Sequence, residues 1–133
     1  MSVFESNKVE TTKIDSSLDS VTIRQYLGGI TGGRALDYTN FTDDVIKAGH
    51  IIVKKTVDGE VVYSPLAVED GAYKALAADE SYAGVVVASK NNGEAVAIMD
   101  NGRVNDESVP YPITDAMKTA IKAVLPQLVF EHD

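Results

Sequence analysis

The chain has 133 residues, enough to bury one hydrophobic core and too few for two ordinary domains. It carries 20 Asp and Glu against 12 Lys and Arg, a net charge of −8, and a surface of that sign repels nucleic-acid phosphates and anionic lipids. The absence of cysteine excludes disulfides, thiol catalysis and cysteine-ligated metal sites. No apolar run is long enough for a signal peptide or a membrane span, so we expect a protein that folds in a cytosol and binds neither membrane nor nucleic acid.

Residues 1–40 differ in composition from the rest, because Ser, Thr, Asn and Asp recur and large apolar residues stand alone. We expect an extended N-terminal arm, either a flexible tail or a segment that becomes ordered on a partner. Residues 21–27 are strand-like, and the glycines at 28, 29, 32 and 33 leave the next stretch loose or able to lie flat against another surface. Arg and Tyr are enriched at interface hot spots. The candidate partner-binding residues are Ile23, Arg24, Tyr26, Leu27, Arg34 and Tyr38.

Residues 41–133 are expected to form one compact domain of mainly β (α+β) class. Residues 50–57 and 60–68 are rich in β-branched side chains and flank Asp58-Gly59, which favours a hairpin turn. Further strands are predicted at 82–89, 94–99 and 127–131, with turns at 70–71, 91–93 and 100–102. Turns at this spacing are typical of a sandwich or barrel, and we expect a small tulip-like β-barrel.

One helix is predicted near the C-terminus. Thr114 is its expected N-cap, Asp115 places negative charge in its first turn, and Pro126 ends it. Apolar residues at three- and four-residue steps predict a core-facing side. These residues are Met117, Ala120, Ile121, Val124 and Leu125.

The sequence contains no recognisable catalytic, metal-binding or cofactor-binding motif. His50 is expected to be a half-exposed strand residue, and His132 to fray with the C-terminus. The glycine-rich run before Arg34 lacks the lysine, the hydroxyl residue and the helix of a phosphate loop. The acidic pairs at 43–44, 79–80 and 106–107 are expected to be solvated turn charges. We therefore do not expect an enzyme, although carboxylates distant in sequence could still assemble a small hydrolase site in a pocket.

The C-terminal two thirds resemble one protein family in the order of their segments. These are residues 81–87 (SYAGVVV), 95–105 (AVAIMDNGRVN) and 109–113 (VPYPI), then the helix and the final Leu128-Val129-Phe130. Tailed-phage head-decoration and head-fibre proteins show the same order. The resemblance covers about residues 45–131. In the order of its segments the chain resembles lambda-type capsid decoration proteins. In the residues of those segments it is more similar to head-fibre proteins of phages of intestinal Bacteroides-type bacteria.

The resemblance implies an auxiliary capsid protein on the exterior of the virion, made in the cytoplasm of the host bacterium. Its expected partner is the major capsid protein, and its expected state is a homotrimer that stabilises the shell or anchors a head-fibre protein. Arms of several copies would act together through effective concentration, and residues 21–27 would add as a strand to a capsid sheet.

The alternative hypothesis is a module that binds glycans or proteins of the host surface. Aromatic platforms would carry that activity. The candidate platforms are Tyr63, Tyr73, Tyr82 and Tyr111.

Overall fold

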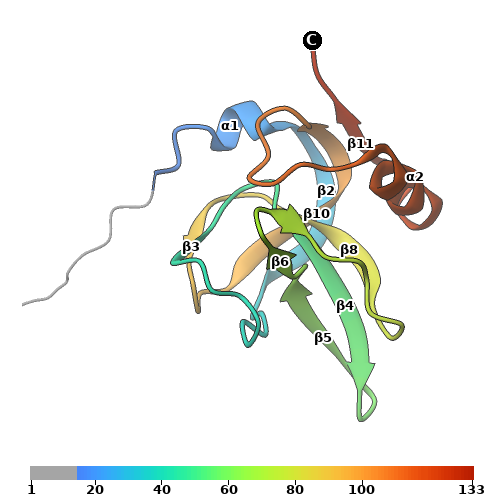
Figure 1. The fold of residues 1–133 in the computed structure, drawn as a ribbon. Coiled ribbons are helices and arrows are strands. Elements are labelled where there is room, and N and C mark those ends of the chain that lie inside the picture. Colours follow the sequence, from blue (N-terminus) through green and yellow to red (C-terminus); the bar gives the residue numbers. More distant parts are fainter. Residues whose placement is uncertain (1–14) are drawn as a thin grey trace, which may run out of the picture.

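A six-stranded sheet organises the molecule, which confirms the mainly β prediction. The computed structural model describes residues 15–133. The strands follow the order β11-β10-β8-β4-β5, and β2 also pairs with β10 (Figure 1). Their bounds are β2 Ile23–Arg34, β4 Ile51–Val57, β5 Glu60–Pro65, β8 Ser81–Val86, β10 Val96–Asn105 and β11 Leu128–Glu131.

The remaining elements are short. Strand β3 (Val45–Ile46) pairs with β9 (Lys90–Asn91), and β6 (Val68–Glu69) pairs with β7 (Ala72–Tyr73). Helix α1 (Asp19–Thr22) precedes β2, and α2 (Asp115–Val124) precedes β11. No helix in residues 15–133 is long and apolar enough to cross a membrane.

The sheet does not close into the expected barrel, so that part of the fold prediction is wrong. The chain after β2 touches β5 through a single isolated bridge between Leu36 and Tyr63, where the Asp37 N–H donates to the Tyr63 carbonyl at 2.8 Å. The Asp37 side chain then accepts from the Thr39 N–H at 3.0 Å, a local turn that ends further pairing. Strands β2 and β5 therefore approach each other without forming a ladder.

Strand β10 lies at the centre of the sheet and meets its neighbours at glycines. A Cβ atom at Gly29 of β2 would lie 2.1 Å from the Ile98 carbonyl oxygen. One at Gly84 of β8 would lie 2.4 Å from the Met99 oxygen. At Gly102 of β10 itself, a Cβ would lie 2.3 Å from the Gln25 oxygen of β2. Because real Cβ atoms do not approach backbone this closely, these positions require glycine.

The turn predicted at residues 100–102 is wrong, because β10 runs through these residues without reversing. Its pairing with β2 shifts register between Met99 and Asn101, and again between Asn101 and Gly102. Bulges of this kind bend and twist a strand without ending it. The Asp-Asn-Gly signal therefore marks an irregularity inside a long strand.

The hairpin prediction around Asp58-Gly59 is confirmed. Strands β4 and β5 pair antiparallel, and Asp58 and Gly59 have φ angles of 51° and 83°. Positive φ at both central residues is the requirement of a type I′ turn, which matches the twist of the flanking strands.

The loose arm expected for residues 1–40 is not what the structure shows over residues 23–34. This segment forms β2, which pairs with β10 from Ile23 opposite Val104 to Arg34 opposite Val96. Gly28, Gly29 and Gly33 lie against β10, the second of the two possibilities that the sequence left open. Residues 1–14 of the expected arm lie outside the described residues.

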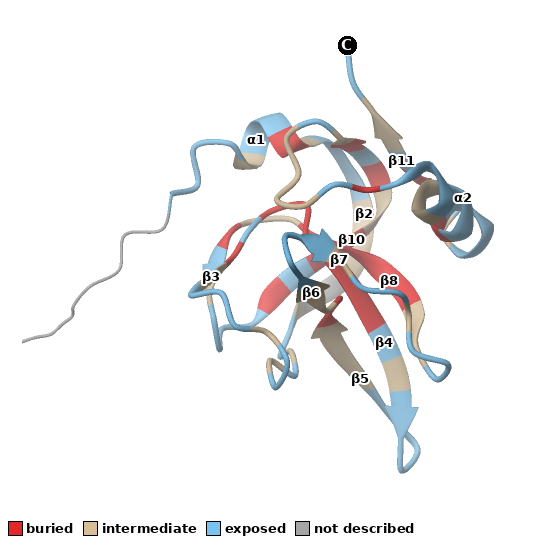
Figure 2. Ribbon diagram, in the orientation of Figure 1, coloured by how far each residue is buried: buried red, intermediate tan, exposed pale blue. Residues whose placement is uncertain are grey.

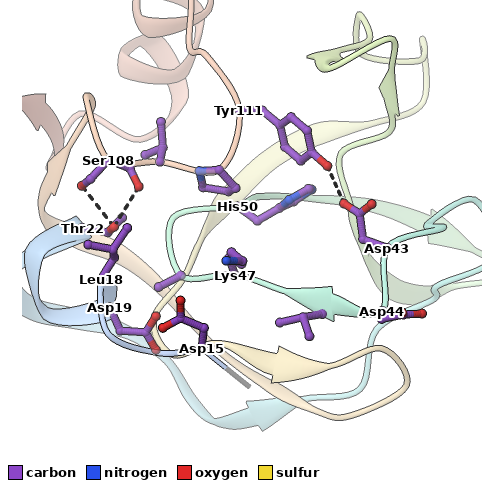
Figure 3. A pocket seen from close by; sticks show the side chains of 14 residues that line it. Asp15, Leu18, Asp19, Thr22, Asp43, Asp44, Lys47, His50, Ser108 and Tyr111 are labelled. Carbon is purple, nitrogen blue, oxygen red and sulfur yellow. Dashed lines mark hydrogen bonds between the residues drawn. The ribbon is translucent and has the colours of Figure 1, made fainter. Parts of the chain in front are cut away.

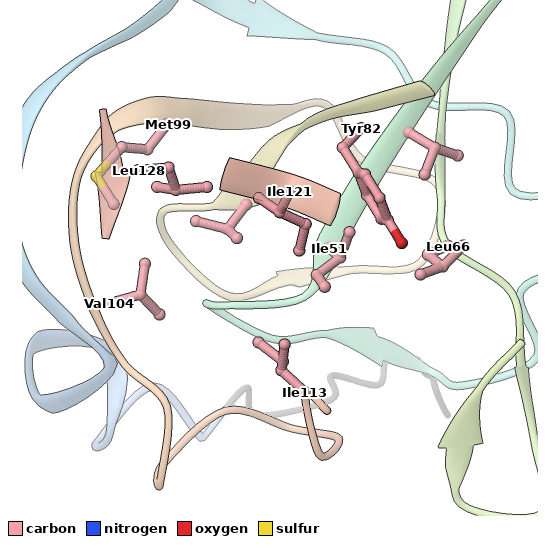
Figure 4. Packing of buried hydrophobic residues seen from close by; sticks show 10 residues of the cluster. Ile51, Leu66, Tyr82, Met99, Val104, Ile113, Ile121 and Leu128 are labelled. Atoms are coloured by element: carbon pink, nitrogen blue, oxygen red, sulfur yellow. The ribbon is translucent and has the colours of Figure 1, made fainter. Parts of the chain in front are cut away.

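The buried side chains form two clusters. Buried positions lie mainly on the strands of the sheet (Figure 2). The larger cluster joins the sheet to α2 and β11, and it includes Ile51, Val104, Ile121 and Leu128 (Figure 4). The smaller cluster gathers Ile46, Ile52, Ala83, Val86, Val96 and Ile98.

Helix α2 begins and ends where the sequence predicts. The Met117 N–H donates to the Thr114 hydroxyl at 3.2 Å, which is the expected N-cap bond, and the helix ends before Pro126. The predicted apolar face is narrower in the structure, because Ile121 is buried while Val124 is 53 % exposed. Met117 and Leu125 are partly buried against the same cluster as Ile121, whereas Ala120 and Val124 are exposed.

We predict that an alanine substitution destabilises the protein at Gly29 of β2 but not at the neighbouring Gly28. Gly29→Ala should lower the free energy of unfolding by at least ~2 kcal/mol, because its Cβ meets backbone that cannot move aside. Gly28→Ala is the matched control, since its Cβ would lie 3.8 Å from Asn101 Cβ, and should change stability by less than ~0.5 kcal/mol. Urea denaturation of both variants measures the difference, and equal effects would contradict this account of β10.

Candidate functional site

The outer edge of β2, meaning the side of Ile23–Arg34 that faces away from β10, is the first candidate site. Within residues 15–133, β10 is the only strand paired with β2. The strand is 12 residues long. An unpaired strand edge presents backbone N–H and carbonyl groups to a further strand, so this edge is able to bind an extended segment.

Two of the predicted binding residues are available on this strand. Tyr26 is 52 % exposed and Leu27 is 59 % exposed. Successive side chains of a strand point to opposite faces, so β2 is open to solvent on both faces at this point. An exposed aromatic and an exposed leucine on an unpaired edge are typical of an interaction surface.

The other two predicted residues in the first half of β2 already have intramolecular roles. Ile23 packs against the larger core cluster. The Arg24 guanidinium lies 3.3 Å from Glu131 and 2.9 Å from Asp133, so it holds the C-terminal strand.

The two remaining predicted residues lie elsewhere. Arg34 is exposed at the far end of β2, more than ~20 Å from Tyr26 at the rise of a strand. Tyr38 donates its hydroxyl to the Glu94 carbonyl at 2.5 Å, and its ring packs at 5.8 Å from that of Phe41. The structure therefore brings only Tyr26 and Leu27 together as exposed neighbours.

A cluster of charges joins the C-terminus to the sheet and to α2. Glu131 accepts a hydrogen bond from Arg103 at 2.7 Å and forms an ion pair with Arg24. Asp106 has a side chain only 6 % exposed and binds Lys118 at 2.5 Å and His132 at 2.7 Å. Burial alone would raise the pKa of Asp106, but the hydrogen bonds from Lys118 and His132 outweigh it and lower that pKa. His132 is thus held rather than frayed, and Asp106 is not the solvated turn charge that the sequence suggested.

We predict a measurable pH signature of the bond between His132 and Asp106. The hydrogen bond to Asp106 raises the pKa of His132 above 6.5, with Glu107 adding to the effect. The stabilisation from this pair is therefore complete below 6.5 and is lost as pH rises through the raised pKa. NMR titration of the imidazole should show the raised pKa in the wild type and a lower one in Asp106→Asn. Equal pKa values in the two proteins would disprove the contact.

Polar contacts that the sequence analysis missed fasten α1 to the domain. The Asp19 carboxylate accepts from the Ser89 N–H at 2.8 Å and from the Ser89 hydroxyl at 2.7 Å. The Ser89 oxygen also accepts from the Ala48 N–H at 3.1 Å. On the other side of α1, the buried Thr22 hydroxyl donates to the Ser108 carbonyl at 3.1 Å. These partners are 70 and 86 positions apart in the chain, so no local pattern could have identified them.

A cavity of about 460 Å³ opens beside α1 and is the second candidate site. Its walls come from α1 and the residues before it, from the loop at 43–50, and from residues 108–111. Figure 3 shows Asp15 and Asp19 at one end, Asp43 and Tyr111 at the other, and His50 between Tyr111 and Lys47.

His50 is the main buried polar residue of this cavity, which corrects the expectation of a half-exposed strand position. It is 1 % exposed, and its ring meets those of Phe41, Tyr73 and Tyr111 edge-on at 5.2–5.8 Å. Its Nε2 atom lies 3.1 Å from the Leu66 carbonyl oxygen. Burial lowers the pKa of His50 to about 4, although the Leu66 carbonyl and Asp43 act in the opposite direction. The imidazole is therefore neutral near pH 7.

Asp43 and Tyr111 form a fixed pair at the same end of the cavity. The Tyr111 hydroxyl donates to Asp43 Oδ2, and this hydrogen bond raises the pKa of Tyr111 to about 12. The phenol therefore stays protonated and orients the carboxylate.

The arrangement does not resemble a hydrolase site in the described part of the chain. The Ser108 hydroxyl contacts Thr22 at 3.1 Å, whereas the His50 Nε2 atom faces Leu66, so this serine and histidine are not paired. The carboxylate oxygens of Asp19 are both occupied by Ser89. No group of three or more metal-ligating side chains comes together in residues 15–133.

We predict that His50 destabilises the protein on acidification. The unfolded chain binds a proton at His50 below pH 6.5, whereas the folded chain does so only near 4, so stability falls as pH decreases through this window. The loss attributable to His50 should approach ~3 kcal/mol. Urea denaturation at several pH values should show a shallower decline in His50→Gln than in the wild type. Parallel curves would mean that His50 does not titrate as described.

Comparison with known proteins finds no match to this chain: no family model, no curated protein and no solved structure is significantly similar to it. The resemblance to phage decoration and head-fibre proteins therefore rests only on the order of the sequence segments and on the residues in them.

Proposed function

We propose that the chain is an auxiliary capsid protein that binds the outer surface of a tailed-phage head through the outer edge of β2. In this proposal the major capsid protein supplies an extended segment that pairs with β2. Copies of the chain associate as a homotrimer, stabilise the shell and offer a base for a head-fibre protein. The sequence resemblance names the class, and the observation that carries the binding mode is the unpaired edge with Tyr26 and Leu27 exposed.

Because β2 is held in the sheet, we replace the expected ordering of a loose arm on the capsid with binding to a strand that is already formed. Residues 21–27 are already part of the domain, since α1 is fastened through Asp19 and Thr22 and β2 is paired with β10. A capsid segment would therefore dock on a preformed edge, and this edge would not pay an ordering cost on binding. Backbone hydrogen bonds would provide affinity, while Tyr26 and Leu27 would contribute apolar contact on the two faces.

If the chain is trimeric, each β2 edge needs only a weak contact with the capsid for the trimer to bind tightly. Three edges that engage neighbouring capsid subunits would bind as one unit through effective concentration. Binding only the assembled lattice would then stabilise that lattice by mass action. The net charge of −8 supports a role in which the chain makes no contact with the packaged DNA.

Two of the four candidate tyrosines, Tyr73 and Tyr82, give no support to the alternative of a glycan-binding module. Tyr82 is 8 % exposed and belongs to the larger core cluster. Tyr73 accepts from the Ile51 N–H at 3.1 Å and packs against His50 and Tyr111. Neither ring forms an exposed platform for a sugar.

We predict that charges on the outer edge of β2 abolish capsid binding. The test is cosedimentation of the purified protein with heads of a tailed phage whose genome encodes it, after their own copies have been removed. A Tyr26→Glu/Leu27→Glu variant should bind at least tenfold less, because glutamates on a strand edge oppose pairing with another chain.

Val57→Glu/Val61→Glu provides the matched control, since Val57 is 43 % and Val61 53 % exposed on the separate β4–β5 hairpin. This variant should bind as the wild type does. Circular dichroism confirms that each variant is folded. A wild-type protein that does not sediment with heads would overturn the proposed function, whereas full binding by the folded double variant would overturn the role of β2.

A further inference from the structure

The cavity beside α1 contains a buried hydrogen-bond acceptor without a partner. The Leu66 carbonyl can only accept, so the neutral His50 carries its proton on Nε2, 3.1 Å from that oxygen. His50 Nδ1 is then a lone-pair acceptor, on a side chain that is 1 % exposed and lines the cavity. No hydrogen bond reaches this atom from residues 15–133. Because buried polar atoms are rarely left without a partner, Nδ1 indicates that a donor belongs here.

A second unused acceptor lies at the same end. The exposed Asp43 receives the Tyr111 hydroxyl on Oδ2, and within the described chain its Oδ1 has no hydrogen-bond donor, so it is open to a ligand from solution. Tyr111 links Asp43 to His50, since its ring lies 5.8 Å from the imidazole, and Asp43 also acts on the pKa of His50. A single ligand group with several N–H donors could satisfy both.

The charge of the cavity wall favours a cation. Four aspartates line it, Asp15, Asp19, Asp43 and Asp44, against the one ammonium group of Lys47. With His50 neutral, three negative charges of this lining are uncompensated. A metal ion is not indicated, because no set of three ligating side chains converges in the described part of the chain.

The remaining wall is apolar and aromatic. Leu18, Val109 and Pro110 line the cavity together with the ring of Tyr111. Apolar walls accommodate an aliphatic stem, and an aromatic face attracts a cation. The space of about 460 Å³ exceeds what a bare ion needs and suits a small organic group.

We propose that this cavity binds a guanidinium group on a short aliphatic stem, which donates to Asp43 and to His50 Nδ1. The stem lies against Leu18, Val109 and Pro110. A guanidinium suits two acceptors, because it carries five donors in one plane. The group belongs either to an arginine side chain of a partner protein or to a free small guanidine. This site does not depend on the proposed capsid role.

The test uses two matched pairs of probes on the full chain, followed by NMR. Butylguanidinium should bind, whereas butylurea, which has the same shape without the charge, should bind at least tenfold more weakly. An acetylated and amidated Gly-Arg-Gly tripeptide, compared with its citrulline counterpart, distinguishes the sources. Binding of the peptide assigns the site to a partner side chain, and binding of butylguanidinium alone assigns it to a free small guanidine.

The side-chain ¹⁵N signals of His50 give a readout that a structural role would not move. In the free protein they should report the Nε2–H tautomer, and the Nδ1 signal should shift when butylguanidinium binds. Asp43→Asn keeps an acceptor for Tyr111 and removes the charge, so it should weaken binding at least tenfold. Asp58→Asn, the same change at the distant hairpin turn, should not.

Equal affinity for butylguanidinium and butylurea, or no binding of either cationic probe, would overturn the proposal. So would cation binding that leaves the Nδ1 signal of His50 unchanged. The comparison of charged and neutral probes is made on the wild type, so it remains decisive even if Asp43→Asn does not fold.

Discussion

The close approach of three strands at β10 is the constraint on which the rest of the fold depends. Gly29, Gly84 and Gly102 each leave a place where backbone lies within about 2.5 Å of a missing Cβ. Strand β10 can therefore pair with β2, β8 and β11 along its length. This central position of β10 sets where the edge of β2 lies and where the C-terminal strand is held.

The fastening of α1 links the two candidate sites. The bonds from Asp19 to Ser89 and from Thr22 to Ser108 fix the segment that leads into β2. The same segment supplies one wall of the cavity through Leu18, Asp19 and Thr22. The segment that leads into the exposed edge therefore also forms part of the cavity, and polar bonds hold it in place.

Basic residues are distributed unevenly between the C-terminal region and the cavity. Arg24, Arg103 and Lys118 are paired with carboxylates near the C-terminus. The cavity lining keeps Lys47 as its one ammonium group against four aspartates. Since burial keeps His50 uncharged, the imidazole supplies an acceptor and no compensating charge.

Local chemistry by itself determined the mainly β class, the Asp58-Gly59 hairpin and the limits of α2, because turn conformation, capping and strand propensity depend on residues close in sequence. It also placed Tyr26 and Leu27 among the binding candidates. Only the tertiary structure decided that β2 joins the sheet, that β10 continues through residues 100–102, and that His50 and Asp106 are enclosed. Those outcomes depend on partners such as Ser89, Leu66 and His132, which lie far along the chain from the groups they contact. Burial and pairing between residues so far apart depend on the complete fold, so they cannot be predicted from residues that are close in sequence.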